Sequence, residues 1–575
     1  MTPTDAYLQL RAFCDELVRC GVTDACTSPG SRSTPLVLSL AREPGLRATS
    51  HLDERSGAFF ALGLAKASGR PVVLACTSGT AAANYAPAVI EAYEARVPLL
   101  VLTADRPPEL RDVGAGQTID QVKLFGRAAK WFLEVDDAPA TPARLRWMRQ
   151  LACRAVHVAT DGRPGPVHLN VALREPLVLD APLPADEPGG GGRPDGAPWV
   201  RRDPAPPAAD PARAAALAAA LRHAAAPLLV AGRLERPGAG AAVAAFAERA
   251  GLPLLADPLS GARRGAAIAH YDAYLRDAAI ADRLRPDLVV RAGDLPTSKP
   301  LRQWLAGLAP EVPQVALDPE NAWQDPAAAV SELLPADPQA LFGALDVPPH
   351  GPAWLDRWRR ADAAAIEAFA AVLGGTALSE PVVAARTMGR LRGQDALVVA
   401  ASMPVRDLET FAEVTADPPR VLSNRGANGI DGTASTALGV AAATAGTTVL
   451  LTGDVALLHD LGGLLATRRA GGRLVVVVID NDGGGIFHFL PVAGETDHFT
   501  EHVATPHGVD LARAAALYGL RHVLADDVAG FDAGLDEALA ADGSTLLQVR
   551  TDRDANVGLH REVWAAVAAS VRRGA

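Results

Sequence analysis

The stretch from Val449 to Ile486 decides the fold, and it reads VLLTGDVALLHDLGGLLATRRAGGRLVVVVIDNDGGGI. It holds two apolar runs, 449–451 and 474–479, whose β-branched character suits parallel strands covered on both faces. The segment between them, 459–469, has helical character. The stretch therefore predicts a strand, a helix and a second strand parallel to the first.

A polar side chain follows each run: Asp454 the first and Asn481 the second. A right-handed crossover would bring both to the carboxyl edge of the sheet, where open α/β sheets bind ligands. Taken singly, such residues are usually turn formers or helix caps. Together, a carboxylate and an amide oxygen suit Mg²⁺ and its phosphate partners, and Gly483 to Gly485 allow the backbone to come close. The pair predicts a magnesium-held diphosphate.

The arrangement resembles the thiamine diphosphate motif, which begins Gly-Asp and ends in Asn. Here these residues are Gly453, Asp454 and Asn481. The third position of the motif is Val455 rather than the commoner Gly, a departure that touches neither ligand.

The composition is that of an ordinary globular protein, with 49% hydrophobic and 21% charged residues. At 575 residues the chain is too long for one core, and about 150 residues per domain predicts three or four domains. No apolar run approaches the roughly 20 residues of a membrane span, and the first residues lack the order of a secretory signal. We therefore expect a cytoplasmic protein without a membrane span.

The formal charge of −11 argues against nucleic acid as a partner. It also means that an anionic substrate needs a local cluster of cations, because the overall field repels it. The five cysteines are odd in number and contain no CxxC pair, so we expect buried thiols rather than disulfides or a zinc site.

Two Pro- and Gly-rich segments divide the chain into three parts of plausible domain size. We predict a first domain at 1–185, a linker at 186–200, a middle domain at 201–347 and a last domain at 348–575. All three look α/β, with mainly parallel sheets, because short apolar strands alternate with alanine-rich helices such as 214–220. The expected strands are 72–76, 99–102, 227–232, 288–291 and 396–400.

Glu54 stands at the start of an apolar helix, 58–67. On local grounds it is a capping or dipole partner. Thiamine diphosphate, however, needs one buried carboxylate against its aminopyrimidine ring, and Glu54 is the strong candidate in the first domain.

Cationic residues accumulate at predicted strand ends and loops. Any one of them suits a surface charge or an ion pair, but several that converge would suit substrates with more than one carboxylate. They are Arg32, Arg106, Lys299, Arg406 and Arg425.

Eight segments, in this order, resemble the 2-succinyl-5-enolpyruvyl-6-hydroxy-3-cyclohexene-1-carboxylate (SEPHCHC) synthase family, also called MenD. They span residues 28–487, and TADRPPEL and SNRGANGIDG separate the family from other thiamine enzymes. The segments are SPGSRSTPL, HLDERS, TSGTAAAN, TADRPPEL, SMPVRD, SNRGANGIDGTASTALG, TGDVALLHD and IDNDGGGIF.

The resemblance implies a pyrimidine-binding domain first, a middle domain without cofactor and a diphosphate-binding domain last. It also implies a homodimer or homotetramer with sites between subunits. Mg²⁺, or Mn²⁺ in its place, would be held by Asp454, Asn481 and the carbonyl of Gly483. The resemblance further implies roles for Glu54 as the activating acid, Ile430 as the wedge under the bent cofactor and Ser402 in the cofactor site, and a substrate-binding set of Ser31, Arg32, Arg106, Gln117, Lys299, Arg406 and Arg425.

The implied reaction is decarboxylation of 2-oxoglutarate and addition of the remaining carbon unit to isochorismate, in menaquinone biosynthesis. One alternative is another thiamine diphosphate enzyme, such as an acetohydroxyacid synthase or a 2-oxoacid decarboxylase, which has less need of so many arginines. A silent binding protein is a second, although Glu54, Asp454 and Asn481 are all retained. A nicotinamide dehydrogenase is weaker, since Gly232 and 238–240 form no GxGxxG.

Overall fold

The computed structural model describes residues 2–185, 191–202, 207–375, 377–495 and 497–574. The chain forms two compact units. The first comprises Met1–Pro204, Asn424–Thr444 and His459–Arg473, and the second comprises Ala205–Ser423, Ala445–Leu458 and Leu474–Ala575. The described residues form three parallel sheets, one in the first unit and two in the second. The α/β class with parallel sheets is therefore confirmed.

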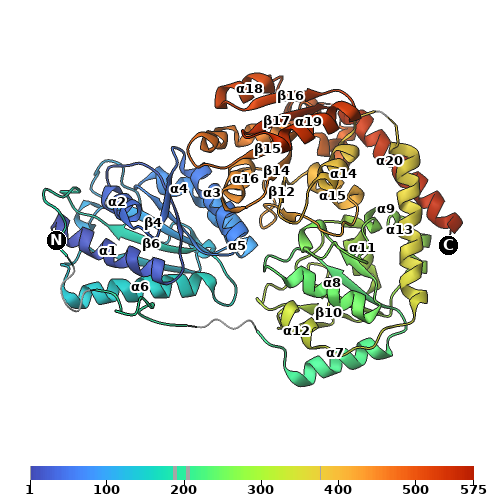
Figure 1. Ribbon diagram of the computed structural model, residues 1–575, viewed down its shortest axis with the longest axis horizontal. Helices are drawn as coiled ribbons and strands as arrows, with labels where there is room; N and C mark the ends of the chain where they lie inside the picture. The colour runs from blue at the N-terminus through green and yellow to red at the C-terminus, as the bar shows by residue number, and fades with distance from the viewer. Residues whose placement is uncertain (1, 186–190, 203–206, 376, 496, 575) are drawn as a thin grey trace. The chain divides into compact units, whose positions relative to one another are not determined.

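The sheet of the first unit has six strands, in the order β2-β1-β3-β4-β6-β5. Alternate residues of the central strands face α1 and α6, whose side chains share one apolar cluster with them (Figure 1). The strands are β1 (Asp24–Thr27), β2 (Arg47–Ser50), β3 (Val72–Cys76), β4 (Leu99–Asp105), β5 (Trp131–Val135) and β6 (Val167–Ala172).

The helices of the first unit come from all three of its chain segments. They are α1 (Pro3–Arg19), α2 (Thr34–Arg42), α3 (Glu54–Ser68), α4 (Thr80–Asn84), α5 (Ala86–Ala95), α6 (Pro142–Thr160) and α16 (Thr433–Ala443), with short 3₁₀ helices at Pro108–Leu110, Gly126–Ala128 and Leu461–Arg468.

Within this unit α3 and α16 pack at close range because glycine stands at both contact points. A Cβ on Gly63 would lie 2.0 Å from the carbonyl oxygen of Thr436, and one on Gly439 would lie 2.0 Å from that of Phe60. The residue that initiates α3 is set by Asp53, whose side chain accepts the N–H groups of Arg55 and Ser56. Glu54 therefore occupies the first position of the helix.

The first sheet of the second unit has the order β11-β10-β9-β7-β8. Its strands are β7 (Pro227–Ala231), β8 (Leu254–Ala256), β9 (Leu288–Ala292), β10 (Gln314–Leu317) and β11 (Glu332–Leu334). The helices that follow or precede them are α7 (Pro211–His223), α8 (Ala239–Ala250), α9 (Tyr271–Tyr274), α10 (Ala278–Arg283), α11 (Lys299–Leu308), α12 (Pro338–Ala344) and α13 (Pro352–Leu373), with a 3₁₀ turn at Pro258–Ser260.

The second sheet of this unit has the order β13-β12-β14-β15-β17-β16. Its strands are β12 (Ala396–Val399), β13 (Arg420–Leu422), β14 (Thr448–Gly453), β15 (Leu474–Asp480), β16 (Arg521–Ala525) and β17 (Thr545–Arg550). Its helices are α14 (Glu380–Arg390), α15 (Met403–Phe411), α17 (Asp454–His459), α18 (Leu511–Tyr518), α19 (Val528–Ala540) and α20 (Arg553–Gly574), with 3₁₀ turns at Gly485–Phe489 and Pro491–Gly494 and a π-helical turn at Thr500–Ala504.

β14 and β15 lie at the centre of this sheet and pair in parallel, with Gly453 opposite Ile479. Residues 449–451 and 474–479 are at most 1% exposed, as continuous apolar runs in a doubly covered sheet require. The pairing places the ends of both strands at one edge, and Asp454 and Asn481 follow there. The strand prediction and the shared edge are confirmed.

The helical segment expected over 459–469 is present, but as a 3₁₀ helix rather than an α-helix. Helix α17 begins at Asp454 itself and ends at His459, and Leu461–Arg468 is a 3₁₀ helix. Gly462 and Gly463 explain the change, because adjacent glycines weaken an α-helix.

The other expected strands are confirmed within a few residues. The alanine run lies in α7, where Leu217, Ala218 and Leu221 are buried and most other side chains are not.

All five cysteines are free thiols, and only Cys20 is less than fully buried. The domain boundaries stay a prediction, and 186–190 of the expected linker lies outside the described residues. No helix in the described part of the chain combines the length and apolarity that crossing a bilayer requires.

Candidate active site

Asp454 is a buried carboxylate held by the loop that follows β15. It is 2% exposed, and its Oδ2 accepts the N–H groups of Asn481 at 3.1 Å and Gly483 at 3.0 Å. Its Oδ1 accepts the N–H of Val455 at 2.6 Å. Burial raises the pKa of this carboxyl, and the backbone N–H donors oppose that effect. The two strand ends are thus joined through Asp454.

Asn481 presents a free oxygen at the same edge. Its Nδ2 donates to Glu380 Oε1 at 3.0 Å, while its Oδ1 is buried and has no hydrogen-bond partner. A buried amide oxygen without a partner is costly, so its presence calls for a ligand that the protein does not itself supply.

The loop after Asn481 is shaped by glycine. Gly483 has φ +140°, and a Cβ there would lie 2.3 Å from the carbonyl oxygen of Ala504. Only glycine fits this position. Asp482 accepts the N–H groups of His507 at 2.9 Å and Gly508 at 2.8 Å, which hold its pKa below the ordinary value.

His507 and Asp480 complete a cluster around Asp454. One ligand atom from each of the three residues lies within 4.8 Å of the others. His507 Nε2 is 3.2 Å from Asp454 Oδ2. Together with the free Oδ1 of Asn481, this oxygen-rich set fits a hard divalent cation such as Mg²⁺, which also takes diphosphate oxygens and water.

Ser402 and Arg406 lie at the start of the helix that follows the neighbouring strand. β12 pairs with β14, and its carboxyl end leads through Ser402 into α15. Ser402 has φ 74°, a left-handed conformation that is rare for residues other than glycine and that clusters at functional sites. The guanidinium of Arg406 donates to the carbonyl of Ser402. Burial, and then the nearby charge of Arg302, lower the pKa of Arg406.

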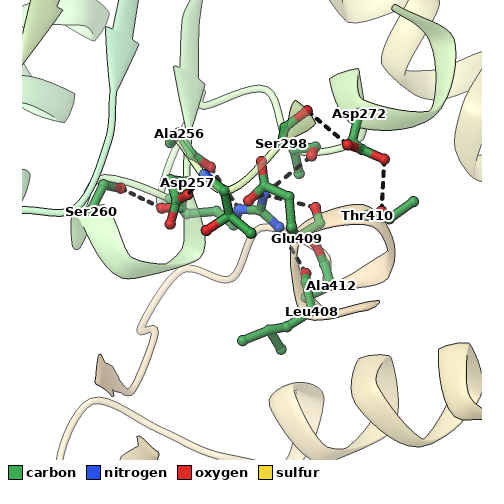
Figure 2. Close-up of polar contacts among 12 residues, drawn as sticks. Ala256, Asp257, Ser260, Asp272, Ser298, Leu408, Glu409, Thr410 and Ala412 are labelled. Atoms are coloured by element: carbon green, nitrogen blue, oxygen red, sulfur yellow. Dashed lines mark hydrogen bonds and ion pairs between the residues drawn. The ribbon is translucent and has the colours of Figure 1, made fainter. Parts of the chain in front are cut away.

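Lys299 and Arg302 are two further cations, and both lie on α11. Lys299 is the exposed first residue of the helix. Ser298 caps the helix by accepting the N–H of Leu301, and its hydroxyl donates to Asp272 Oδ1 at 2.7 Å. The other oxygen of Asp272 accepts the hydroxyl of Thr410, on α15, at 2.9 Å (Figure 2). Asp272 therefore ties the helix of Lys299 to the helix of Arg406.

Arg263 makes a second link to α15. It is buried, and its guanidinium donates to the carbonyls of Ala256 at 2.8 Å, Leu408 at 3.3 Å and Ala412 at 3.0 Å. It also pairs with the buried Glu409, which is labelled in Figure 2, at 3.1 Å. The guanidinium of Arg263 thus joins three carbonyls and one carboxylate, so it holds α15 at the end that follows Arg406.

In the first unit, Arg106 and Gln117 form one cluster with Ser78. Arg106 donates to the Ser78 hydroxyl and to the Gln117 carbonyl, the latter at 2.7 Å. The Gln117 side chain donates to the Ser78 carbonyl at 3.0 Å, and Gln117 has a left-handed backbone, φ 57°. Burial and the charge of Arg32 lower the pKa of Arg106, which places Arg32 nearby.

Arg32 is buried, and its guanidinium donates to the carbonyl of Leu173 at 3.0 Å and to Glu175 Oε1 at 2.9 Å. Its Nε is buried without a partner. Ser31, the residue before it, is exposed. The expected substrate residues Ser31, Arg32, Arg106 and Gln117 thus lie in one region of the first unit.

Glu54, Arg425 and Ile430 also belong to the first unit. Glu54 is half-buried in the first turn of α3. Burial raises the pKa of the nearby Cys76 thiol, and the charge of Glu54 adds to that rise. Arg425 and Ile430 are half-buried in the segment before α16, and the carbonyl of Ile430 accepts the hydroxyl of Thr433 at 2.8 Å.

The structure therefore gathers the expected residues into separate groups. Asp454, Asn481 and Gly483 lie together, Ser402 and Arg406 stand on the adjacent strand–helix junction, and Lys299 is tied to that helix. Sequence reasoning missed Ser78, Asp272, Arg302 and Glu380. None carries a local signal, because a Ser, Asp or Glu beside a helix start reads as a cap and Arg302 reads as a surface charge.

Three models of thiamine pyrophosphate enzymes match the chain. The N-terminal TPP-binding domain matches residues 10–124, the middle domain 196–399 and the C-terminal TPP-binding domain 406–549. A 2-succinyl-5-enolpyruvyl-6-hydroxy-3-cyclohexene-1-carboxylate synthase of Geobacillus kaustophilus is 43% identical, over 98% of this chain and 98% of the relative. The chain belongs to the SEPHCHC synthase family.

Two further SEPHCHC synthases are similar along nearly their whole length. The one of Chloroflexus aurantiacus is 44% identical over 96% of this chain and 95% of its own, and the one of Halobacterium salinarum is 42% identical over 97% of each. The chain is therefore a thiamine pyrophosphate enzyme and a transferase of the SEPHCHC synthase family, as its sequence motifs predicted.

Proposed function

We propose that the chain decarboxylates 2-oxoglutarate and adds the resulting succinyl unit, in a 1,4-addition, to isochorismate, which gives the SEPHCHC of menaquinone biosynthesis. The observation that carries this proposal is the similarity to SEPHCHC synthases over nearly the whole chain. When bound, thiamine diphosphate would supply the electron sink for the loss of carbon dioxide and for carbon–carbon bond formation.

Asp454, Asn481 and the carbonyl of Gly483 would hold Mg²⁺, or Mn²⁺ in its place. The free Oδ1 of Asn481 and the buried Asp454 carboxylate support this assignment. Ser402, at the end of the neighbouring strand, would line the cofactor site, and Ile430 would support the bent cofactor.

Glu54 would hold a proton at the pyrimidine ring of the cofactor through its carboxylate. A positioned carboxylate of this kind typically contributes factors of about 10² to 10⁴ in rate. In the single chain Glu54 is only half-buried. We propose that a second subunit covers it, so that the working form is a homodimer or homotetramer with sites between subunits.

Five cationic residues, together with Ser31 and Gln117, would bind the two substrates, and the cations would pair with their carboxylates. The set comprises Ser31, Arg32, Arg106 and Gln117 in the first unit, Arg425 before α16, and Lys299 and Arg406 in the second unit. Burial, and then the charge of Arg32, lower the pKa of Arg106, so an anionic substrate would relieve the repulsion between these two guanidinium groups. The expected cytoplasmic location is also part of this proposal.

A comparison of donors tests the proposal. Purified protein with Mg²⁺, thiamine diphosphate and isochorismate is given 2-oxoglutarate or pyruvate, and carbon dioxide release is followed. We expect 2-oxoglutarate to be strongly preferred, because its second carboxylate has a cationic partner in the site. A preference for pyruvate would instead favour an acetohydroxyacid synthase or a simple decarboxylase, and no release with either donor would favour a silent binding protein.

A further inference from the structure

The side-chain amide of Asn481 has two chemically different ends. Its oxygen can bind a cation, whereas its NH₂ group is a donor and would repel one. The two ends have nearly the same shape, so a metal site built on this residue needs a device that selects the orientation.

Glu380 faces the NH₂ end. It is the first residue of α14 and is 1% exposed. Its Oε1 accepts the Asn481 Nδ2 at 3.0 Å and the hydroxyl of Thr551 at 3.0 Å. A carboxylate oxygen is an acceptor, so this contact forms when the NH₂ group points toward Glu380. The Oδ1 of Asn481 then points away from Glu380 and is left free.

Glu380 is itself held in place from the other side. Thr551 follows β17, and its N–H donates to the carbonyl of Asp480 at 3.0 Å, just before Asn481. The start of α14 and the ends of β15 and β17 therefore meet at one carboxylate. Among the described residues Glu380 forms no ion pair with Lys or Arg, and burial raises its pKa to about 7 although the charge of His560 opposes that rise.

We propose that Glu380 is a positioning residue that fixes the amide of Asn481 with its oxygen toward the metal ion. The inference rests on the proposed metal site and adds to it a residue that contacts the ligand Asn481 rather than the ion. Partners of this kind typically change metal affinity by about 10- to 100-fold when they are removed.

The test measures Mn²⁺ binding by electron paramagnetic resonance in the presence of thiamine diphosphate, which does not depend on turnover. Glu380→Met removes the acceptor, and we expect the dissociation constant of Mn²⁺ to rise about 10-fold or more. Glu380→Gln keeps an acceptor oxygen, so the rise should stay within about threefold. Thr551→Val removes the other partner of Glu380 without touching Asn481 and serves as the matched control, with a change also within about threefold.

Thermal unfolding separates positioning from a merely structural role. Glu380→Met removes the cost of burying a carboxylate but leaves the donors of Asn481 and Thr551 without their acceptor, so we expect these opposing effects to keep its unfolding temperature close to that of the parent. A protein that is as stable as the parent but binds Mn²⁺ weakly supports the proposal. Normal Mn²⁺ affinity in Glu380→Met overturns it.

Asn481→Ala distinguishes this proposal from the metal site on which it rests. If Asn481→Ala also binds Mn²⁺ normally, the metal site itself is wrong. If Asn481→Ala binds weakly while Glu380→Met binds normally, only the role of Glu380 is wrong.

A charge exchange gives a second measurement in case Glu380→Met does not fold. Asn481→Asp places a carboxylate against Glu380, and we expect weak Mn²⁺ binding from the repulsion. Adding Glu380→Gln supplies an NH₂ donor to the new carboxylate. The double variant should therefore bind Mn²⁺ at least about 10-fold more tightly than Asn481→Asp alone. A double variant no better than Asn481→Asp would contradict a direct contact.

Discussion

At the scale of single residues, the candidate site is an edge of one sheet where polar groups are held by backbone donors. Asp454 has its N–H partners from the loop of Asn481, whereas Asn481 leaves its oxygen without one. The backbone donors thus fix the Asp454 carboxylate in place, and the Asn481 oxygen stays open to a cation. Both are oxygen ligands of the kind that Mg²⁺ takes.

Glu54→Gln tests the assigned acid. We expect turnover to fall by about 10² or more, because the amide cannot hold the proton at the pyrimidine ring. Cofactor binding, measured by the quenching of tryptophan fluorescence, and the circular dichroism spectrum should stay as in the parent. Near-normal turnover would remove Glu54 from the mechanism.

His168 predicts how stability depends on pH. It is buried between the rings of Phe125 and Phe132, and its Nε2 lies 2.8 Å from the hydroxyl of Thr103, which itself donates to Asn170. Nε2 therefore carries the hydrogen. Its Nδ1 has no partner, so protonation would bury a charge, and burial lowers the pKa from 6.5 to about 3.

Because the pKa of His168 is lower in the folded protein than in the unfolded chain, the unfolding free energy falls as the pH falls. The contribution of His168 to the unfolding free energy is fully present above pH 6.5, where the histidine is neutral in the unfolded chain too. It is lost as the pH falls toward 3, because the unfolded state takes up the proton first. Between pH 6.5 and 4.5 the unfolding free energy of the parent should fall by about 2 kcal/mol more than that of His168→Gln, which cannot titrate. Urea unfolding at several pH values measures this, and parallel curves for the two proteins would refute it.

Of the residues expected from sequence, chain direction alone determines the position of Asp454 and Asn481, whereas the substrate-binding set was implied by the family resemblance. Asp454 and Asn481 follow consecutive parallel strands, so their edge could be predicted without knowing any tertiary contact. Glu380 and Asp272 act through partners 101 and 26 residues away in the chain, and no spacing rule links them to those partners.

At the scale of elements, the expected strands were predictable because they are mainly apolar runs in doubly covered parallel sheets. For segment 459–469 the helical character was predictable but its 3₁₀ form was not, since the glycines weaken the α-helix that the leucines favour. The close packing of α3 on α16 could not be foreseen either. It joins segments far apart in sequence, and an isolated glycine in a helix carries no sign of what lies against it.

Gly439→Ala tests that packing. The new Cβ would lie 2.0 Å from the carbonyl oxygen of Phe60, so the helices must separate, and we expect a loss of about 2 kcal/mol or more of unfolding free energy. Gly307→Ala, in α11, meets nothing within 4 Å and is the matched control. That change should leave the stability equal or raise it by up to about 1 kcal/mol. Equal urea midpoints for both variants would contradict the close approach.

At the scale of the whole molecule, the proposal divides one active site between subunits. Glu54 then serves the cofactor whose diphosphate is bound by Asp454 and Asn481 of another copy. The acid and the metal ligands belong to different compact units of the chain, as this division requires.

Complementation tests the shared site. Glu54→Gln and Asp454→Ala should each be inactive alone. When the two variants are co-expressed, mixed dimers contain one site with both changes and one intact site, so about a quarter of the parent activity should return. A different affinity tag on each variant, with purification on both tags in turn, confirms that mixed oligomers form. Mixed oligomers without activity would place the acid and the metal ligands of a site in one chain.

The central claim is the reaction itself, and isotopic labelling tests it most directly. The protein is incubated with Mg²⁺, thiamine diphosphate, isochorismate and 2-oxoglutarate labelled with ¹³C at its 2-oxo carbon, and the product is identified by mass spectrometry. We predict SEPHCHC with the label retained in its succinyl group, no label in carbon dioxide, and no product when any component is omitted. An unlabelled product, or carbon dioxide release with no adduct to isochorismate, would contradict the account.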